Sequence, residues 1–441
     1  MSIDRDRVTQ LRISGLRAIR DLVLDCRGLT VLIGDNGTGK SSIIEALEIL
    51  RQSAKPFSHV PDIISKGHGG LQSLLRRGAS ELRLGITIEG NGPRVDYDFS
   101  VAFVGNSPSV ISERVDAYVD TTAPEPLHAL IRTGSRIRVF DTTQRRLVDN
   151  AVLNQDAGDK TTPANSDWNP YVDAANASIG DQALALPHLG RSQQPAIPRL
   201  IDALGQIDVH VPFETRPLWQ QKELDIRQGP RWPSLIESTD RLARYGVNLP
   251  NAFQQLRNEG DATWNRVIER ARLGLGEDLR NFRLSPVGRG SIELELDFGA
   301  FPEKPLPTEV LSEGQISYLA FVALCELHSS RSLLAFDEPE LHLHPALLSR
   351  VVWMLEEASQ SAPVIVATHS DRLLDALAEP ASAVVLCELD DQRAVRIRRP
   401  DPDRLGEWLS EYRGLGSIRA EGYEPHVFGG EAQSPGGTAE R

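Results

Sequence analysis

The sequence is poor in the features that mark exported or membrane-spanning chains. It has only three cysteines in 441 residues, Cys26, Cys325 and Cys387, and each lies far from the others in or beside an apolar run. Such thiols exclude a disulfide framework and a cysteine metal cluster, and they indicate buried, reduced side chains in a cytosolic protein. No apolar run reaches about 18 residues, and the first residues lack the apolar core of a leader peptide. We therefore expect a cytoplasmic chain with no membrane contact.

The sequence also lacks an excess of basic charge. Its formal net charge is −13 and its pI is about 5.3, which argues against a uniformly basic nucleic-acid binder but leaves room for a local arginine patch. The hydrophobic share of 40% and the charged share of 25% are those of an ordinary globular protein. The length predicts about two or three domains, or one domain with a large insertion.

A glycine-rich stretch near the N-terminus organises the chain. The apolar run Val31–Ile33 leads directly into the pattern G-x-x-x-x-G-K-S, and a helical pattern follows. This order of strand, loop and helix is that of a phosphate-binding loop, whose glycines turn tightly and direct backbone N–H groups at phosphate oxygens. Lys40 would reach the β- and γ-phosphates and Ser41 would hold Mg²⁺. The alternative is a purely structural role, in which the motif is a glycine-rich turn before a core helix. The predicted nucleotide-binding residues of this loop are Gly34, Asp35, Asn36, Gly37, Thr38, Gly39, Lys40, Ser41 and Ser42.

Two further strands end in residues that suit nucleotide chemistry. The run 332–336 ends in Asp337 and Glu338, and the run 363–367 is followed by His369, which lies 31 positions after Glu338 (369 minus 338). Strands that are apolar on both faces and alternate with helices predict a parallel sheet, so these residues should meet at one edge. Asp337 would hold Mg²⁺, Glu338 would orient or deprotonate a water, and His369 would contact the γ-phosphate or that water. Read singly, each has a structural alternative, a turn or a strand-end hydrogen bonder.

A third motif opens a helix 22 residues before Asp337 (337 minus 315). Ser312, Gly314 and Gln315 lie in the stretch Leu-Ser-Glu-Gly-Gln, and a helix start with a hydroxyl and an unobstructed backbone favours an anion. The alternative is an ordinary N-cap. Together with the other motifs, the stretch resembles the signature of ABC-type ATPases, from which it departs because Glu313 replaces a glycine. The resemblance implies that the signature of one subunit covers ATP held by another, and hence a homodimer or a higher homo-oligomer with ATP and Mg²⁺ as cofactors.

The spacing and the other motifs narrow the resemblance. Gly39 and Ser312 are 273 positions apart (312 minus 39), more than a transporter ATPase needs, which favours soluble heads like the RecF-like and structural-maintenance-of-chromosomes groups. The stretches 245–249, 337–345 and 367–371 look like the soluble AAA-type ATPases of bacteria. These are similar to the ATPase parts of overcoming-lysogenization-defect nucleases and of anti-phage systems, in which the ATPase controls a nuclease or toxin effector.

Two expectations of that family are not met cleanly. Gln72 is the nearest candidate for a glutamine lid, but it precedes a helix-like stretch and the position stays open. The nucleases carry a further domain of about a hundred residues, and only 72 follow His369 (441 minus 369), so we expect the nuclease to be a separate chain. His342 and His344 lack a third ligand nearby, which favours a loop between subunits over a zinc site.

The predicted fold class is α/β, a P-loop NTPase of the ABC type with an ATPase head of two lobes. Residues 1–105 would form the N-terminal lobe, which includes a hairpin around residues 90–92 with one face exposed to solvent. Residues 106–305 would form a mostly helical, partly flexible insertion, with helical patterns at residues 197–204, 249–257 and 263–275 and a polar stretch without periodicity at residues 156–170. Residues 306–400 would form the C-terminal lobe, which ends in a closing hairpin of residues 383–389 and 394–398. Residues 401–441 would form a C-terminal helix and a disordered tail.

We expect a Mg²⁺-dependent ATPase that dimerises with ATP and gates a separate effector, such as a nuclease in anti-phage defence. The main alternative is a DNA repair or recombination ATPase that binds DNA as an ATP-driven clamp. A second and less favoured alternative is a transporter ATPase subunit. A DNA-binding face would draw on the arginines of residues 266–283, for which a solvated face laced with acidic residues is the alternative. Those arginines are Arg266, Arg270, Arg272, Arg280 and Arg283.

Overall fold

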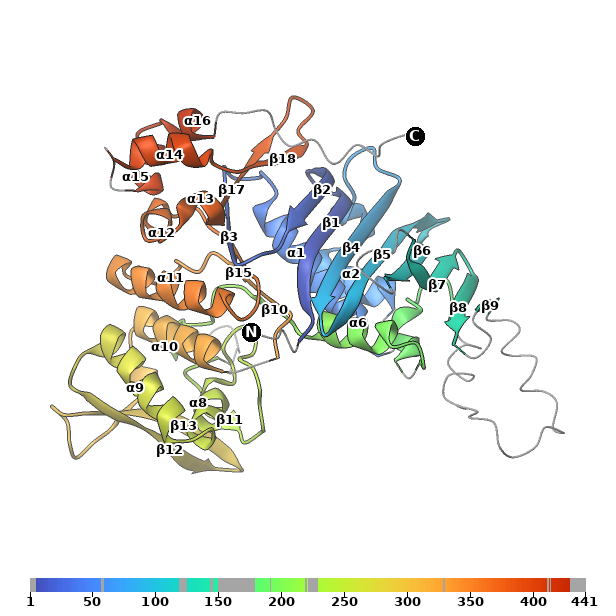
Figure 1. Cartoon of the computed structure of the whole chain (residues 1–441). Helices are drawn as coiled ribbons and strands as arrows, with labels where there is room; N and C mark the ends of the chain where they lie inside the picture. The colour runs from blue at the N-terminus through green and yellow to red at the C-terminus, as the bar shows by residue number, and fades with distance from the viewer. Residues whose placement is uncertain are drawn as a thin grey trace.

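A computed structural model shows the fold for most of the chain. It describes residues 5–56, 59–118, 125–142, 146–149, 179–190, 192–218, 220, 229–327, 330–410, 412 and 414–428. These residues form three β-sheets with helices between and around them (Figure 1). None of the described helices combines the length and the apolar character that crossing a bilayer requires.

The central sheet has six strands in the order β10-β15-β16-β3-β17-β18. Five of them run parallel, and β18 closes the sheet as the antiparallel partner of β17. The strands are short and almost wholly buried, as expected for a parallel sheet with both faces covered. Their bounds are β10 (Ile207–His210), β15 (Leu333–Asp337), β16 (Val364–Ala367), β3 (Leu29–Ile33), β17 (Val384–Leu389) and β18 (Val395–Arg398).

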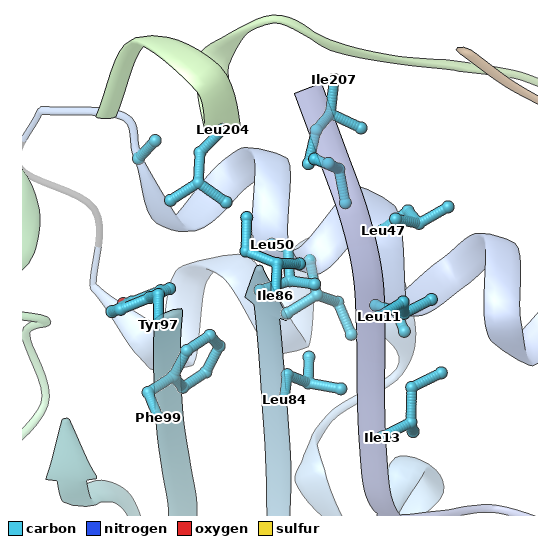
Figure 2. Close-up of a cluster of buried hydrophobic side chains, with 14 of the residues drawn as sticks. Leu11, Ile13, Leu47, Leu50, Leu84, Ile86, Tyr97, Phe99, Leu204 and Ile207 are labelled. Carbon is cyan, nitrogen blue, oxygen red and sulfur yellow. The ribbon is translucent and has the colours of Figure 1, made fainter. Parts of the chain in front are cut away.

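One face of the central sheet packs on a long helix, α1 (Lys40–Ser53), which is covered in turn by a second sheet. Leu47 and Leu50 of α1 lie against Leu11 of β1 and Ile86 of β4, and all four side chains are at most 1% exposed (Figure 2). α1 is thus held between two sheets, which fixes the position of its N-terminus. The second sheet is antiparallel, with strands β2 (Ile19–Asp25), β1 (Arg7–Leu16), β4 (Glu81–Gly90), β5 (Gly92–Val104), β6 (Ser107–Ala117), β7 (Leu127–Thr133), β8 (Arg136–Asp141) and β9 (Arg146–Asp149).

The other face of the central sheet is covered by a layer of helices and by the third sheet. Side chains of β3 alternate between the two cores, because Leu32 joins the cluster that contains α1 whereas Val31 and Ile33 join the cluster that contains α10. α1 and α10 therefore lie on opposite faces of the sheet. The layer comprises α8 (Leu249–Asn258), α9 (Asp261–Leu275), α10 (Glu313–Glu326), α11 (Pro345–Ser359), α12 (Asp371–Asp375) and α13 (Pro380–Ala383), with strands β11 (Ser234–Leu235), β12 (Leu279–Gly288), β13 (Ser291–Phe298) and β14 (Leu306–Pro307).

Shorter helices complete the fold. Three of them lie in the C-terminal segment, namely α14 (Pro402–Leu409), α15 (Leu415–Ala420) and α16 (Glu424–Val427). They pack beside α12 and α13, and α15 makes tight contacts with α12 (Figure 1). A Cβ on Gly416 would lie 1.9 Å from the carbonyl oxygen of Asp371, so only glycine fits there. The remaining helices are α2 (Val60–His68), α3 (Leu71–Leu74), η2 (Leu186–Leu189), α6 (Ala196–Gly205) and η3 (Thr308–Val310).

The expected mostly helical content of residues 106–305 is wrong for the described part of that segment. β5 continues into β6 across the expected boundary at 105, β7 to β9 extend the same sheet, and β10 belongs to the central sheet. The helices expected near residues 197–204, 249–257 and 263–275 are present as α6, α8 and α9. β4 and β5 form the expected hairpin, but Leu84 to Ile88 are all buried, because α1 covers one face and Arg12 reaches over toward Ile86 and Asp98.

Two other expectations concern the ends of segments. The predicted closing hairpin near residues 383–398 is confirmed as β17 and β18. In place of one C-terminal helix there are three, because Gly414 separates α14 from α15 and Gly422, with a left-handed φ of 84°, separates α15 from α16. The polar stretch 156–170 and the expected disordered tail 429–441 lie outside the described residues.

Candidate functional site

The glycine-rich loop follows β3 and opens α1, as the sequence predicts. Gly34, Gly37 and Gly39 have φ values of 140°, 82° and 89°, which other residues rarely adopt. A Cβ on Gly34 would lie 2.1 Å from the carbonyl oxygen of Cys387 in β17, whereas one on Gly37 would meet nothing within 4 Å. The loop therefore packs tightly on the sheet at its start and is open at its middle. Asp35, Asn36 and Gly37 are exposed there.

Lys40, the first residue of α1, is 4% exposed and folds back over the loop. Its Nζ donates hydrogen bonds to the carbonyl oxygens of Gly34 at 2.8 Å and Asp35 at 2.9 Å. Burial lowers the pKa of Lys40, and the positive charge of nearby Arg419 acts in the same direction. A buried ammonium group whose partners in the described residues are two carbonyl oxygens favours the approach of an anion.

Ser41 and Asp337 meet although they come from distant parts of the chain. Ser41 Oγ donates to Oδ1 of Asp337 at 3.4 Å. Burial raises the pKa of Asp337, and the negative charges of Glu338 and Glu340 act in the same direction, while the hydrogen bond from Ser41 opposes them. A hydroxyl and a carboxylate side by side are oxygen ligands of the kind that Mg²⁺ binds.

Glu338 and His369 follow neighbouring strands, β15 and β16. The backbone N–H of Glu338 donates to the carbonyl oxygen of Ala367 at 2.8 Å, and Glu338 has a left-handed φ of 52°. Within the described part of the chain, neither the Glu338 carboxylate nor the His369 ring has a hydrogen-bond partner. A strained turn that leaves a carboxylate and an imidazole open to small molecules is typical of catalytic positions.

Glu340, which the sequence analysis did not single out, links the two strand ends. Its Oε1 accepts hydrogen bonds from Thr368 Oγ1 at 2.7 Å and from the backbone N–H of His369 at 3.0 Å. Its Oε2 is buried without a partner among the described residues. The signal for Glu340 was present, since it is the next carboxylate after Asp337 and Glu338, but only the turn shows that it holds His369.

The signature residues begin α10, as expected. Ser312 Oγ accepts from the backbone N–H of Gln315 at 3.3 Å, and the Gln315 side chain accepts from the backbone N–H of Ser312 at 2.9 Å, which is a capping box. A Cβ on Gly314 would lie 2.8 Å from the carbonyl oxygen of His342, so the first turn of α10 touches the loop after β15.

The structure thus brings together only part of the predicted set. The loop residues, Asp337, Glu338 and His369 share the carboxyl edge of three adjacent strands, because Leu32 pairs with Ala367 and Ala367 pairs with Asp337. The described contacts of Ser312, Gly314 and Gln315 are with one another, with Ile316 of the same helix and with the loop at His342, and none is with residues 34–42.

The two histidines after β15 have separate partners. His342 Nδ1 lies 2.7 Å from Oε2 of Glu313, the residue that departs from the signature pattern. His344 Nδ1 accepts from the backbone N–H of Ala346 at 3.3 Å and caps α11. No group of three or more potential metal ligands occurs among the described histidines, cysteines and acidic residues.

Arg231 is a second residue that the sequence did not reveal. Its side chain is fully buried and donates to the carbonyl oxygens of Thr215, Thr308, Glu309 and Leu311, at 2.6 to 3.2 Å. Burial lowers the pKa of Arg231, while the charge of Glu313 raises it. The guanidinium therefore holds the backbone of the segment that precedes Ser312 in place. No local pattern in the sequence predicts this role.

Four of the five arginines considered for a DNA-binding face have acidic or backbone partners. Arg270 contacts Glu326 and Glu357, and Arg266 contacts Glu326 at 2.8 Å. Arg283 pairs with Asp297 at 3.0 Å, and Arg272 donates to the carbonyl oxygen of Leu279. These four side chains are therefore engaged within the chain, with acidic partners other than the neighbouring carboxylates of the sequence.

Two family models match parts of this chain. The family model described as "AAA ATPase domain" matches residues 7–104, which include the glycine-rich loop. The model described as "AAA domain, putative AbiEii toxin, Type IV TA system" matches residues 231–375, which include the signature, Asp337, Glu338 and His369. Two separate segments of the chain therefore match AAA ATPase domain models, and the fold is that of a P-loop NTPase. The predicted resemblance and fold class are thereby confirmed at this level.

Individual relatives are more distant. A segment of 102 residues is 36% identical to Protein ea59 of Escherichia phage lambda, and the match covers 22% of this chain and 19% of ea59. The SMC head domain from Thermotoga maritima is similar with a TM-score of 0.41 and 12% identity, over 90% of this chain and 99% of that chain. An Smc head domain with an extended coiled coil, bound to the C-terminal domain of ScpA derived from Pyrococcus furiosus, has a TM-score of 0.47 and 13% identity, over 92% and 99%.

Proposed function

We propose that this chain binds ATP with Mg²⁺ at the carboxyl edge of the central sheet and hydrolyses it. The observation that carries the proposal is the contact between Ser41 and Asp337 at 3.4 Å. Lys40 precedes Ser41 in the chain, and His369 follows β16, the strand between β3 and β15. The residues fit Mg²⁺-ATP, since the loop offers backbone N–H groups at a helix N-terminus, a buried ammonium group and a hydroxyl beside a carboxylate.

Each residue has a distinct part in the proposed reaction. Lys40 would exchange its two carbonyl partners for phosphate oxygens, and Ser41 and Asp337 would hold Mg²⁺. Bound Mg²⁺ supplies neutralisation of the negative charge that develops on the phosphates. Glu338 would orient and deprotonate the attacking water, and His369 would contact that water or the γ-phosphate. The open carboxylate of Glu338 and the exposed ring of His369 support these assignments.

We further propose that hydrolysis requires a second copy of the chain. α10 lies on the face of the sheet opposite α1, so the start of α10 at Ser312 does not cover the phosphate loop of its own chain. Ser312 is exposed and is followed by an uncovered helix start, which suits the triphosphate held by another copy. The resulting assembly is a head-to-tail dimer with two nucleotides between the subunits.

The proposed biological role is control of a separate effector, such as a nuclease or toxin in anti-phage defence. It draws on the sequence resemblance and on the matched model whose description names a toxin–antitoxin system. The DNA-clamp alternative has less support, because four of the five arginines considered for it are engaged with acidic or backbone groups. Copurification of the tagged chain from its host, with and without ATP, would identify the effector.

Light scattering tests the proposed dimer. The Glu338→Gln variant should bind ATP without completing hydrolysis, so its mass should double with Mg²⁺-ATP and stay that of one chain with Mg²⁺-ADP. Lys40→Ala in the same background should remain a monomer in both. Glu309→Gln, a change at an exposed carboxylate near the signature, serves as the matched control and should behave like wild type. A variant at Glu338 that stays monomeric with saturating ATP would contradict the dimer.

A further inference from the structure

The signature helix and the loop that carries Glu338 are joined within one chain. Glu313, the first residue of α10, places Oε2 2.7 Å from Nδ1 of His342. The backbones touch as well, because a Cβ on Gly314 would lie 2.8 Å from the carbonyl oxygen of His342. The contact exists because this chain has glutamate where the resembled signature has glycine, and a glycine would leave His342 without this partner.

The loop between Glu338 and His342 depends on contacts of this kind. Its two end residues have left-handed φ values, 52° for Glu338 and 65° for His342, which cost free energy in residues other than glycine. Two backbone hydrogen bonds close it, from Leu341 to Glu338 at 3.3 Å and from Leu343 to Glu340 at 3.1 Å. A strained loop keeps its shape only if its surroundings hold it, and the Glu313 contact is at one end of it.

The same loop also positions His369. Glu340 lies in its middle and accepts hydrogen bonds from Thr368 Oγ1 and from the backbone N–H of His369, at 2.7 Å and 3.0 Å. A shift at His342 is therefore transmitted in two directions, toward the turn at Glu338 and through Glu340 toward His369. Both predicted hydrolytic residues are therefore connected to the signature helix by contacts within a single chain.

Other charged groups lie near the pair. His342 faces Glu313 of α10 and also lies near Glu214, in the segment after β10. Glu313 in turn interacts with the buried guanidinium of Arg231. Arg231 therefore favours the carboxylate form of Glu313, which can accept a hydrogen bond from the His342 ring.

We propose that Glu313 and His342 are positioning residues for ATP hydrolysis in the chain that carries them, in addition to any contact that the signature makes with the nucleotide of another chain. This inference rests on the proposed function. Removing either residue should lower kcat by about threefold to tenfold with little change in ATP affinity, because the loop bearing Glu338 loses one of its supports while the phosphate loop is untouched.

Mixed dimers distinguish an effect within the chain from an effect on the neighbouring chain. One subunit carries Lys40→Ala and holds no ATP, so the single active site combines the phosphate loop of the intact subunit with the signature of the Lys40→Ala subunit. We expect Glu313→Gly to lower kcat when it is placed in the intact subunit, whose own signature faces the empty site. An effect only when it is placed in the Lys40→Ala subunit, or no effect in either, would overturn the proposal.

A double-mutant cycle gives a second measurement in homodimers. Glu313→Gly and His342→Gln should each lower kcat, and the double variant should be no slower than the more damaged single variant, because one contact is lost in all three. Additive losses, or a change in KM alone, would overturn the proposal. Glu309→Gln is the matched control. An inactive wild-type chain would instead overturn the proposed function, so the two proposals fail in different measurements.

Discussion

Ser41 Oγ lies 3.4 Å from Oδ1 of Asp337, although 296 positions separate the two residues in the chain. The order of strands in the central sheet produces this proximity. β16 lies between β3 and β15, so the loop after β3 and the residues after β15 emerge at the same edge with one strand between them. The geometry of the site therefore depends on the folding of the sheet and of the elements packed on it. Substitutions of residues with no role in the proposed reaction can test this dependence.

Arg231 should be essential for the segment that presents the signature. Arg231→Gln should lower the free energy of unfolding by about 2 to 4 kcal/mol, because several buried carbonyl oxygens between Thr215 and Leu311 lose their donor. It should also weaken ATP-dependent association more than nucleotide binding by the isolated chain. Urea unfolding and light scattering measure the two effects. Arg27→Gln, at an exposed position, is the control, and equal stabilities of the two variants would contradict the assigned role of Arg231.

Two glycines of the C-terminal helices should respond oppositely to alanine. A Cβ on Gly416 would lie 1.9 Å from the carbonyl oxygen of Asp371, so Gly416→Ala should separate α15 from α12 and destabilise the fold by about 2 kcal/mol or more. A Cβ on Gly406 in α14 would meet nothing within 4 Å, so Gly406→Ala should stabilise it by about 0.5 to 1 kcal/mol. Thermal unfolding of both variants decides the matter. Similar melting temperatures would show that α15 does not pack on α12 as described.

Asp208 on β10 should make stability depend on pH. Burial alone would raise its pKa, but His210 and Arg331, each 2.9 Å away, hold the pKa of this carboxyl well below its usual value. A lowered pKa in the folded state gives stability that is fully present above the unfolded-state value of about 4 and is lost as the pH falls below it.

The variant Asp208→Asn tests this assignment. At pH 7 it should unfold more easily by about 3 to 5 kcal/mol, because the buried guanidinium of Arg331 keeps its charge without a carboxylate partner. The difference from wild type should shrink as the pH falls below about 4. Asp240→Asn, at a carboxylate whose side chain is 69% exposed, should change stability by less than about 1 kcal/mol. A difference at Asp208 that stays constant from pH 7 to pH 3 would refute the role given to its ionised form.

Much of the candidate site could be predicted because its signals are local. Gly34, Lys40 and Ser41 lie in one contiguous pattern, and Asp337 and His369 each follow a buried apolar strand, so the rule that parallel strands share an edge was enough to bring them together. Arg231 and the pair of Glu313 with His342 could not be found in this way. The carbonyl partners of Arg231 are 16 to 80 positions away in the chain, and Glu313 and His342 are 29 positions apart (342 minus 313). No pattern in the sequence specifies those contacts.

The error over residues 106–305 has a different cause. β13 alternates strictly, with Ile292, Leu294, Leu296 and Phe298 buried, so a two-residue period was present in the sequence. The neighbouring helical patterns of α8 and α9 outweighed it in the interpretation of the segment. β6 to β8 are harder to predict, since Glu113 and Arg132 are buried polar residues that break the alternation. Tertiary hydrogen bonds to residues 180–186 satisfy them, together with bonds from Tyr97 to Glu113 and from Arg132 to Gly134.

The rate of phosphate release from Mg²⁺-ATP, compared between wild type and Glu338→Gln at saturating ATP, tests the central claim most directly. We expect measurable turnover by wild type and a loss of about 10²-fold or more in the variant, because it retains the nucleotide contacts but lacks the base that activates water. The ATP dissociation constant of the two should agree within about threefold. Equal turnover by wild type and Glu338→Gln would contradict the account.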